Sequence, residues 1–170
     1  MRATFAIVLV NASVFLSTCA TPPNLLELIL ETGELRVVTR NSSTTFYYGA
    51  DGPEGPEYEL ARGFAERLGV ELEIYPAGEF HEIFSDLASR RADIAAAGLT
   101  ITPARARNMR FVQPYQEVRQ LLVYRLGRRK PESFADIDGT LAVSRGSSFI
   151  DTLRAAQAEY PELRWQERSG

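Results

Sequence analysis

The run Gly98–Arg105 brings together the kinds of groups that bind a small anion. It follows apolar residues 94–97, which predict a buried strand. Pro103 suits the first position of a helix, where backbone N–H groups point outward. Thr100 adds a hydroxyl, and the forked guanidinium of Arg105 can hold a carboxylate through two hydrogen bonds. We therefore predict a ligand site here; an ordinary surface arginine is the alternative for Arg105.

A second junction of this kind lies at Arg145–Ser148. Residues 140–143 predict another buried strand, and a helix is expected to run on to about Tyr160. Gly146 suits the turn, while Ser147 and Ser148 place hydroxyls at the helix start. Simple helix capping is equally consistent with either serine.

The elements that must position both junctions follow a strand–helix–strand–helix–strand order. Strands are predicted at 35–39, 70–75 and 94–97. This order indicates an α/β fold with a parallel sheet covered by helices. Further along, residues 118–125 favour a long extended crossing and residues 163–166 begin another strand.

Two helices are expected between these strands. The first ends at Gly69 and carries one apolar stripe. The second directs three apolar residues toward the sheet. The stripe of the first helix is Leu60, Phe64 and Leu68, with Ala61 and Ala65 beside it; the second helix contributes Ile83, Phe84 and Leu87.

The polar loop 40–45 follows the first strand and is closed by Phe46, Tyr47 and Tyr48. Ligands of open α/β sheets bind at the carboxyl ends of the strands, so this loop is a second candidate wall of the site. Core packing is the alternative role for its aromatic residues.

Composition limits the remaining possibilities. With 170 residues, 45% hydrophobic and 24% charged, the chain can form one ordinary domain, or one small lobe and part of another. Its net charge of -3 argues against a nucleic-acid partner. One cysteine and one histidine, His81, give no basis for a disulfide, a metal site or a cofactor. His81 itself is expected to cap a helix or face solvent.

Residues 1–20 predict a secretory signal, because Arg2 precedes a mostly apolar run too short to span a membrane. Cys19 stands where a bacterial lipoprotein is cleaved and acylated, with Leu16 three residues before it. Ordinary cleavage after Ala20 is the alternative. Both predict a periplasmic protein, and acylation would anchor it to the outer membrane.

The chain from about residue 35 to residue 166 resembles the type 3 periplasmic solute-binding proteins. These are two-lobed α/β domains that close on amino acids and similar solutes. The resemblance is carried by Leu35-Arg36-Val37, Glu59-Leu60-Ala61, Leu68-Gly69-Val70, Ala92-Asp93-Ile94, Ala97–Arg105, Phe111–Tyr115 and Arg145–Ser148.

The resemblance also implies roles. Arg105 would hold a ligand carboxylate, Thr100 would donate its hydroxyl, and Gly98 would present its backbone. From the second lobe, Gly146, Ser147 and Ser148 would supply amides and a hydroxyl.

Two positions depart from the family pattern. Arg40 stands where amino-acid binders usually carry an aspartate for the ligand ammonium; a cation there favours an additional anionic group. Ser43 stands where the family carries an aromatic residue that stacks on the ligand, although Phe46 keeps an aromatic ring nearby.

Within the family, the chain is most similar to the amino-terminal domain of the lytic murein transglycosylase F subfamily, through segments 39–42, 114–124 and 160–165. That subfamily joins such a domain to a lysozyme-like domain that cleaves peptidoglycan. The expected organisation is a signal (1–20), a tether with a short helix (21–33), lobe 1 (34–116), a crossing strand and connector (117–130) and a partial lobe 2 (131–170).

No catalytic residue is predicted in this chain. Glu132-Ser133 matches a transglycosylase dipeptide, but it lies in a connector without the helix and glycine-rich context that such a site needs. The expected function is recognition of a small anionic solute or muropeptide, with peptidoglycan reached through a further domain. The alternative is a separate amino-acid-binding protein of an ABC importer.

Overall fold

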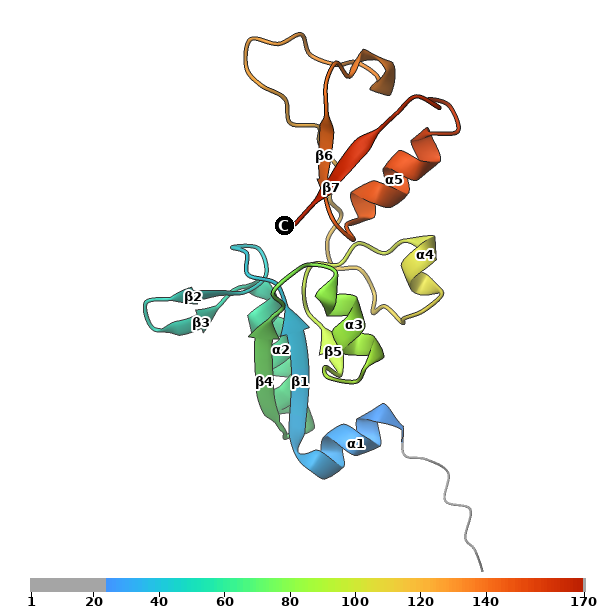
Figure 1. Ribbon diagram of the computed structural model, residues 1–170. Helices are drawn as coiled ribbons and strands as arrows, with labels where there is room; N and C mark the ends of the chain where they lie inside the picture. Colours follow the sequence, from blue (N-terminus) through green and yellow to red (C-terminus); the bar gives the residue numbers. More distant parts are fainter. Residues whose placement is uncertain (1–23, 170) are drawn as a thin grey trace, which may run out of the picture.

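The computed structural model describes residues 24–169, which form two α/β lobes (Figure 1). The first lobe has a three-stranded parallel sheet in the order β4-β1-β5, and the second has a two-stranded parallel sheet. The predicted α/β class is therefore confirmed. The sheet strands are β1 (Glu34–Thr39), β4 (Glu71–Pro76), β5 (Ile94–Ala95), β6 (Leu141–Ser144) and β7 (Trp165–Arg168).

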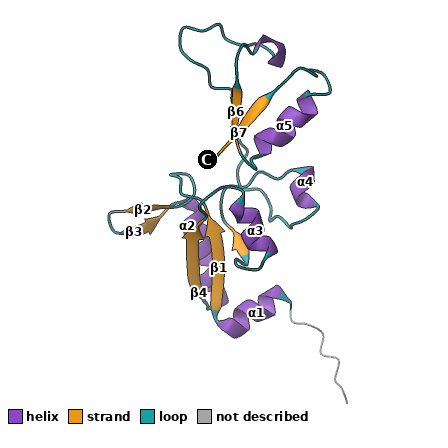
Figure 2. Ribbon diagram, in the orientation of Figure 1, coloured by secondary structure: helices purple, strands orange, loops and turns teal. Residues whose placement is uncertain are grey.

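Helices flank both sheets, and a short antiparallel hairpin projects from the first lobe (Figure 2). The hairpin reverses between Gly49 and Gly52. The helices are α1 (Leu25–Thr32), α2 (Pro56–Leu68), α3 (Glu82–Ala88), α4 (Pro103–Ala106), the 3₁₀ turn η1 (Phe134–Asp136) and α5 (Ser148–Ala156); the hairpin strands are β2 (Tyr47–Gly49) and β3 (Gly52–Glu54).

Strand β1 forms the centre of the first lobe. Successive side chains of a strand point to opposite faces of the sheet. Leu35 and Val37 pack with α1 and α2 on one face, whereas Val38 packs with Ile83 of α3 on the other. All four side chains are fully buried. The first lobe is thus a three-layer arrangement, as parallel sheets require.

The buried face of α2 differs from the predicted stripe. Ala61 and Ala65 are buried against β1, whereas Leu60 and Phe64 are 55% and 42% exposed. Small alanines let the helix lie close to the sheet, and the large residues next to them are then turned outward. Leu68 stays on the packed side, as expected.

Several predicted elements are shorter in the structure than the sequence suggests. The strand expected at 94–97 contains only Ile94–Ala95, although Ala96 and Ala97 are buried. Helix α5 ends at Ala156 rather than near Tyr160. Residues 118–125 form no hydrogen-bonded strand. The predicted signal and Cys19 lie outside the described residues, and within 24–169 no helix is long and apolar enough to cross a membrane.

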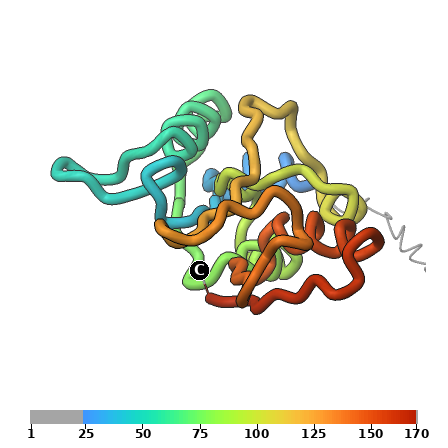
Figure 3. The backbone as a smooth tube through the Cα atoms, turned by 90° about the horizontal axis from the view of Figure 1, so that it is seen from above, coloured from blue at the N-terminus to red at the C-terminus, as the bar shows by residue number. Residues whose placement is uncertain are grey.

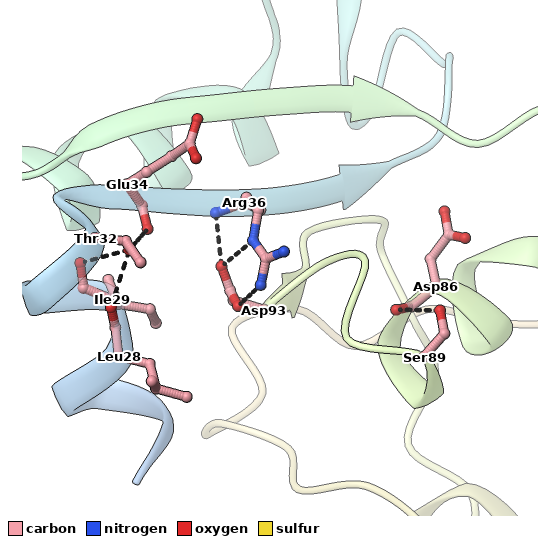
Figure 4. A network of polar contacts seen from close by, with 8 residues as sticks. All are labelled: Leu28, Ile29, Thr32, Glu34, Arg36, Asp86, Ser89 and Asp93. Atoms are coloured by element: carbon pink, nitrogen blue, oxygen red, sulfur yellow. Dashed lines mark hydrogen bonds and ion pairs between the residues drawn. The ribbon is translucent and has the colours of Figure 1, made fainter. Parts of the chain in front are cut away.

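An ion pair between Asp93 and Arg36 joins the edge strand β5 of the first-lobe sheet to the central strand β1 (Figure 4). The carboxylate of Asp93, just before β5, accepts hydrogen bonds from the Arg36 backbone N–H at 2.9 Å, from Nε at 3.1 Å and from Nη2 at 2.6 Å. The Asp93 side chain is 3% exposed. Because β5 has only two residues, this carboxylate replaces ladder bonds that a longer strand would make.

We expect Asp93→Ala to lower the free energy of unfolding by about 2 kcal/mol, because it leaves three donors without their acceptor. Urea denaturation measures this. The control is Arg62→Ala, which removes two exposed ion pairs on α2 and should leave the midpoint nearly unchanged. Equal midpoint shifts in the two variants would contradict the role given to Asp93.

Candidate functional site

A cavity of about 480 Å³ lies between the lobes, at the carboxyl ends of the strands. Both lobes and the crossing segment contribute to its wall. Seen from above, the second lobe lies over the α3 region of the first (Figure 3), and Gly146 packs against Phe80 and His81 there. The lining residues are Arg40, Asn41, Ala77, Gly78, Phe80, Gly98, Thr100, Arg105, Val118, Arg119, Gln120, Ser144, Ser147, Ser148 and Phe149.

Arg105 lies where the two lobes meet. Its Nη1 donates to the Thr100 carbonyl at 2.9 Å, and its Nη2 donates to the Gly146 carbonyl of the second lobe at 2.9 Å. Its guanidinium also stacks over two rings, 4.9 Å from the Phe84 centroid and 5.7 Å from the Phe80 centroid. The sequence-predicted arginine therefore contacts both lobes.

The charge of Arg105 is buried with little compensation. The residue is 9% exposed, and none of the described residues forms a salt bridge with it. Burial lowers the pKa of its guanidinium, with Asp151 partly offsetting the effect. An arginine stays protonated even so. Two of its five N–H donors bond carbonyl groups, so three are available to a ligand.

The start of α4 contributes less than the sequence suggests. Pro103 is at the first helical position, as predicted, but the helix is a single turn. Its cap is closed internally, because the Thr102 hydroxyl accepts the Arg105 backbone N–H at 3.3 Å. The donor from this segment is therefore the guanidinium rather than the helix end. Thr100 lines the cavity as expected.

The second-lobe serines also line the cavity. Ser147 is the N-cap residue of α5, yet its side chain makes no capping hydrogen bond. Its Oγ is buried and is the one such side-chain atom without a partner among the described residues. Capping does not account for Ser147, which leaves its hydroxyl available to a ligand. Ser148 is buried beside it.

The two predicted wall residues near β1 have different positions. Arg40 lines the cavity, with its guanidinium 5.5 Å from the Phe80 ring centroid. Phe46 does not line it. That ring is fully buried and packs edge-on against Tyr48 and Tyr58. Phe46 is therefore a core residue. The aromatic ring next to both Arg40 and Arg105 in the cavity wall is Phe80, which the sequence reasoning missed.

Glu57 is a second residue that the sequence reasoning missed. It is 6% exposed in the first turn of α2, and its Oε1 accepts the Gly98 backbone N–H at 2.7 Å. The Tyr115 hydroxyl donates to the same oxygen. Gly98, at φ +60°, lines the cavity, but its N–H is already bonded, leaving its carbonyl for a ligand. A glutamate on a buried helix face was the available signal.

Burial and the hydrogen bond to Glu57 raise the pKa of Tyr115 to about 12. The phenol therefore stays protonated and keeps donating across the neutral pH range. Glu57 joins three segments in this way: α2, the Gly98 turn and the end of lobe 1 that carries Tyr115.

Comparison with known proteins identifies the family. Residues 35–164 match the family model described as bacterial extracellular solute-binding proteins, family 3. The chain belongs to this family. The resemblance inferred from the sequence is confirmed. Small-molecule sites in proteins often lie at the interface between domains, which is where this cavity lies.

Its curated relatives are named membrane-bound lytic murein transglycosylase F. One from Alkalilimnicola ehrlichii is 45% identical over 148 residues, covering 86% of this chain and 30% of the relative. One from Serratia proteamaculans is 43% identical over 145 residues, covering 85% and 30%. The chain thus spans about 30% of the length of these relatives and matches their solute-binding part.

Solved structures support the two-lobed fold. An ancestral amino acid-binding protein, a precursor of cyclohexadienyl dehydratase, is 30% identical with a TM-score of 0.68, covering 85% of this chain and 65% of that one. An ancestral arginine-binding protein bound to arginine is 28% identical with a TM-score of 0.68, covering 80% and 61%. The periplasmic-binding-protein-like fold is therefore confirmed.

We expect Glu57→Ala to lower the pKa of Tyr115, because the hydrogen bond and the carboxylate charge both favour the protonated phenol. Ultraviolet titration, with Tyr115→Phe as the reference, should show more phenolate at pH 11 in the variant. Glu57→Gln keeps an acceptor oxygen and should fall between the two. An unchanged Tyr115 titration in Glu57→Ala would show that this contact does not form.

Proposed function

We propose that this chain is a periplasmic ligand-recognition domain of a lytic murein transglycosylase F-like protein. Its cavity takes a small anionic solute, either amino-acid-like or a cell-wall peptide. The observation that carries the proposal is the buried guanidinium of Arg105, which contacts both lobes and keeps three N–H donors unused.

The electrostatics of the cavity support an anionic ligand. Burying a charge is costly unless it is paired. Carbonyl groups and aromatic rings stabilise Arg105 in part, but no carboxylate among the described residues pairs with it. A ligand carboxylate would supply that charge, with Thr100 and the partnerless Ser147 hydroxyl as further polar contacts from the two lobes.

The domain organisation that we propose is lobe 1 (34–116), a crossing strand and connector (117–130) and a partial lobe 2 (131–170). Val118, Arg119 and Gln120 of the connector line the cavity. Ligand binding would involve both lobes at once, because Arg105 of lobe 1 already bonds Gly146 of lobe 2.

The whole protein's role is proposed from its relatives. Their printed name describes membrane-bound lytic murein transglycosylases. We infer that the domain reports on small cell-wall solutes and that a lysozyme-like domain on the same protein acts on peptidoglycan. Periplasmic location and an outer-membrane anchor at Cys19 belong to this proposal. The alternative is the amino-acid-binding protein of an importer. The charge of the bound ligand distinguishes the two proposals.

Arg105→Ala should weaken binding of a carboxylate ligand by about 30-fold or more, because it removes a charge-assisted pair of hydrogen bonds. Isothermal titration calorimetry with a muropeptide and with free amino acids measures this, and circular dichroism reports whether the chain stays folded. The matched control is Arg107→Ala, an exposed arginine two residues away, which should bind like the unaltered chain. Equal affinity in both variants would overturn the site assignment.

A further inference from the structure

The charged residues that line the cavity are arginines. Three arginines line it, namely Arg40 from the loop after β1, Arg105 from α4 and Arg119 from the crossing segment. Among residues 24–169, no aspartate or glutamate lines the cavity. Arg119 was not among the sequence-predicted site residues, because the crossing segment gave no sign of reaching the cavity.

Two of these arginines share one aromatic ring. The guanidinium carbons of Arg40 and Arg105 lie 5.5 Å and 5.7 Å from the Phe80 centroid. Cation–π contact with the electron-rich ring face holds each charge in place. It does not neutralise them, so two like charges remain on the same wall of the cavity.

Acidic residues close to the wall do not offset this charge. The Glu57 carboxylate lies behind Gly98, where one oxygen accepts the Gly98 N–H and the Tyr115 hydroxyl. Asp151 raises the pKa of Arg105 only against a larger lowering by burial. Among residues 24–169, none of the three arginines forms a salt bridge.

We propose that the ligand carries at least two anionic groups, and that Arg40 and Arg119 bind the second one. The class is a small dicarboxylate, either a free acid or a short acidic peptide. This inference rests on the proposed function, since it assumes that the inter-lobe cavity is the ligand site.

The arginines on the wall favour a second anionic group. With one ligand carboxylate at Arg105, a second would lie near Arg40 or Arg119. Charge-assisted hydrogen bonds from these guanidinium groups to a carboxylate are stronger than those to a neutral amide.

Calorimetry on the purified chain tests the class with matched probes. Glutarate and 4-carbamoylbutanoate differ by one negative charge, and so do N-acetyl-L-glutamate and N-acetyl-L-glutamine. We expect each first member to bind about tenfold or more tightly than its partner. N-acetyl-alanyl-glutamate distinguishes the two sources: tighter binding than N-acetyl-L-glutamate indicates a peptide, and weaker binding indicates a free acid.

Arg119→Gln should weaken glutarate about tenfold and leave 4-carbamoylbutanoate nearly unchanged. Arg125→Gln, an exposed arginine in the same segment outside the cavity wall, is the control and should change neither. If 4-carbamoylbutanoate binds as well as glutarate, the inference fails while anion recognition by Arg105 stands. If no probe binds, the inference fails, and the proposed function fails as well if the muropeptide of the Arg105 experiment does not bind.

Discussion

The structure depends on a buried positive charge at the boundary between two lobes. Arg105 bonds a carbonyl of its own lobe and a carbonyl of the other, and it stacks over two phenylalanine rings. These contacts fix the guanidinium without neutralising it. A buried cation without a carboxylate partner among the described residues raises the free energy of the unliganded state, and we propose that an anionic ligand lowers it. Under this proposal, binding and lobe arrangement are linked through one side chain.

Other parts of the first lobe hold that side chain in position. The central strand β1 buries apolar residues on both faces, so its carboxyl end and the loop that carries Arg40 are well anchored. Asp93 fastens the two-residue strand β5 to β1, and Glu57 fixes the Gly98 turn that follows. The turn leads directly into α4 and Arg105. Each support is a carboxylate that bonds backbone N–H groups, which sets backbone position more tightly than apolar packing alone.

Sequence patterns predicted the parts of this arrangement that depend on local chemistry. The strand order, the helix start at Pro103 and Arg105 as a candidate site residue follow from residue types and spacing, whereas the role expected of Ser147 came from the family resemblance. The position of Phe46 and the buried face of α2 were misassigned, because which side of a ring or helix is buried depends on packing against distant segments. Arg119 gave no sequence signal, and Glu57 gave only its place on a helix face, because its role depends on a contact with Gly98, more than forty residues away.

A crystal structure of the chain with a bound dicarboxylate such as glutarate tests the central claim most directly. The account predicts one carboxylate within hydrogen-bond distance of the free Arg105 donors and of Ser147 Oγ, and the other beside Arg40 or Arg119. A ligand bound outside the inter-lobe cavity, or inside it with no contact to Arg105, would contradict the account.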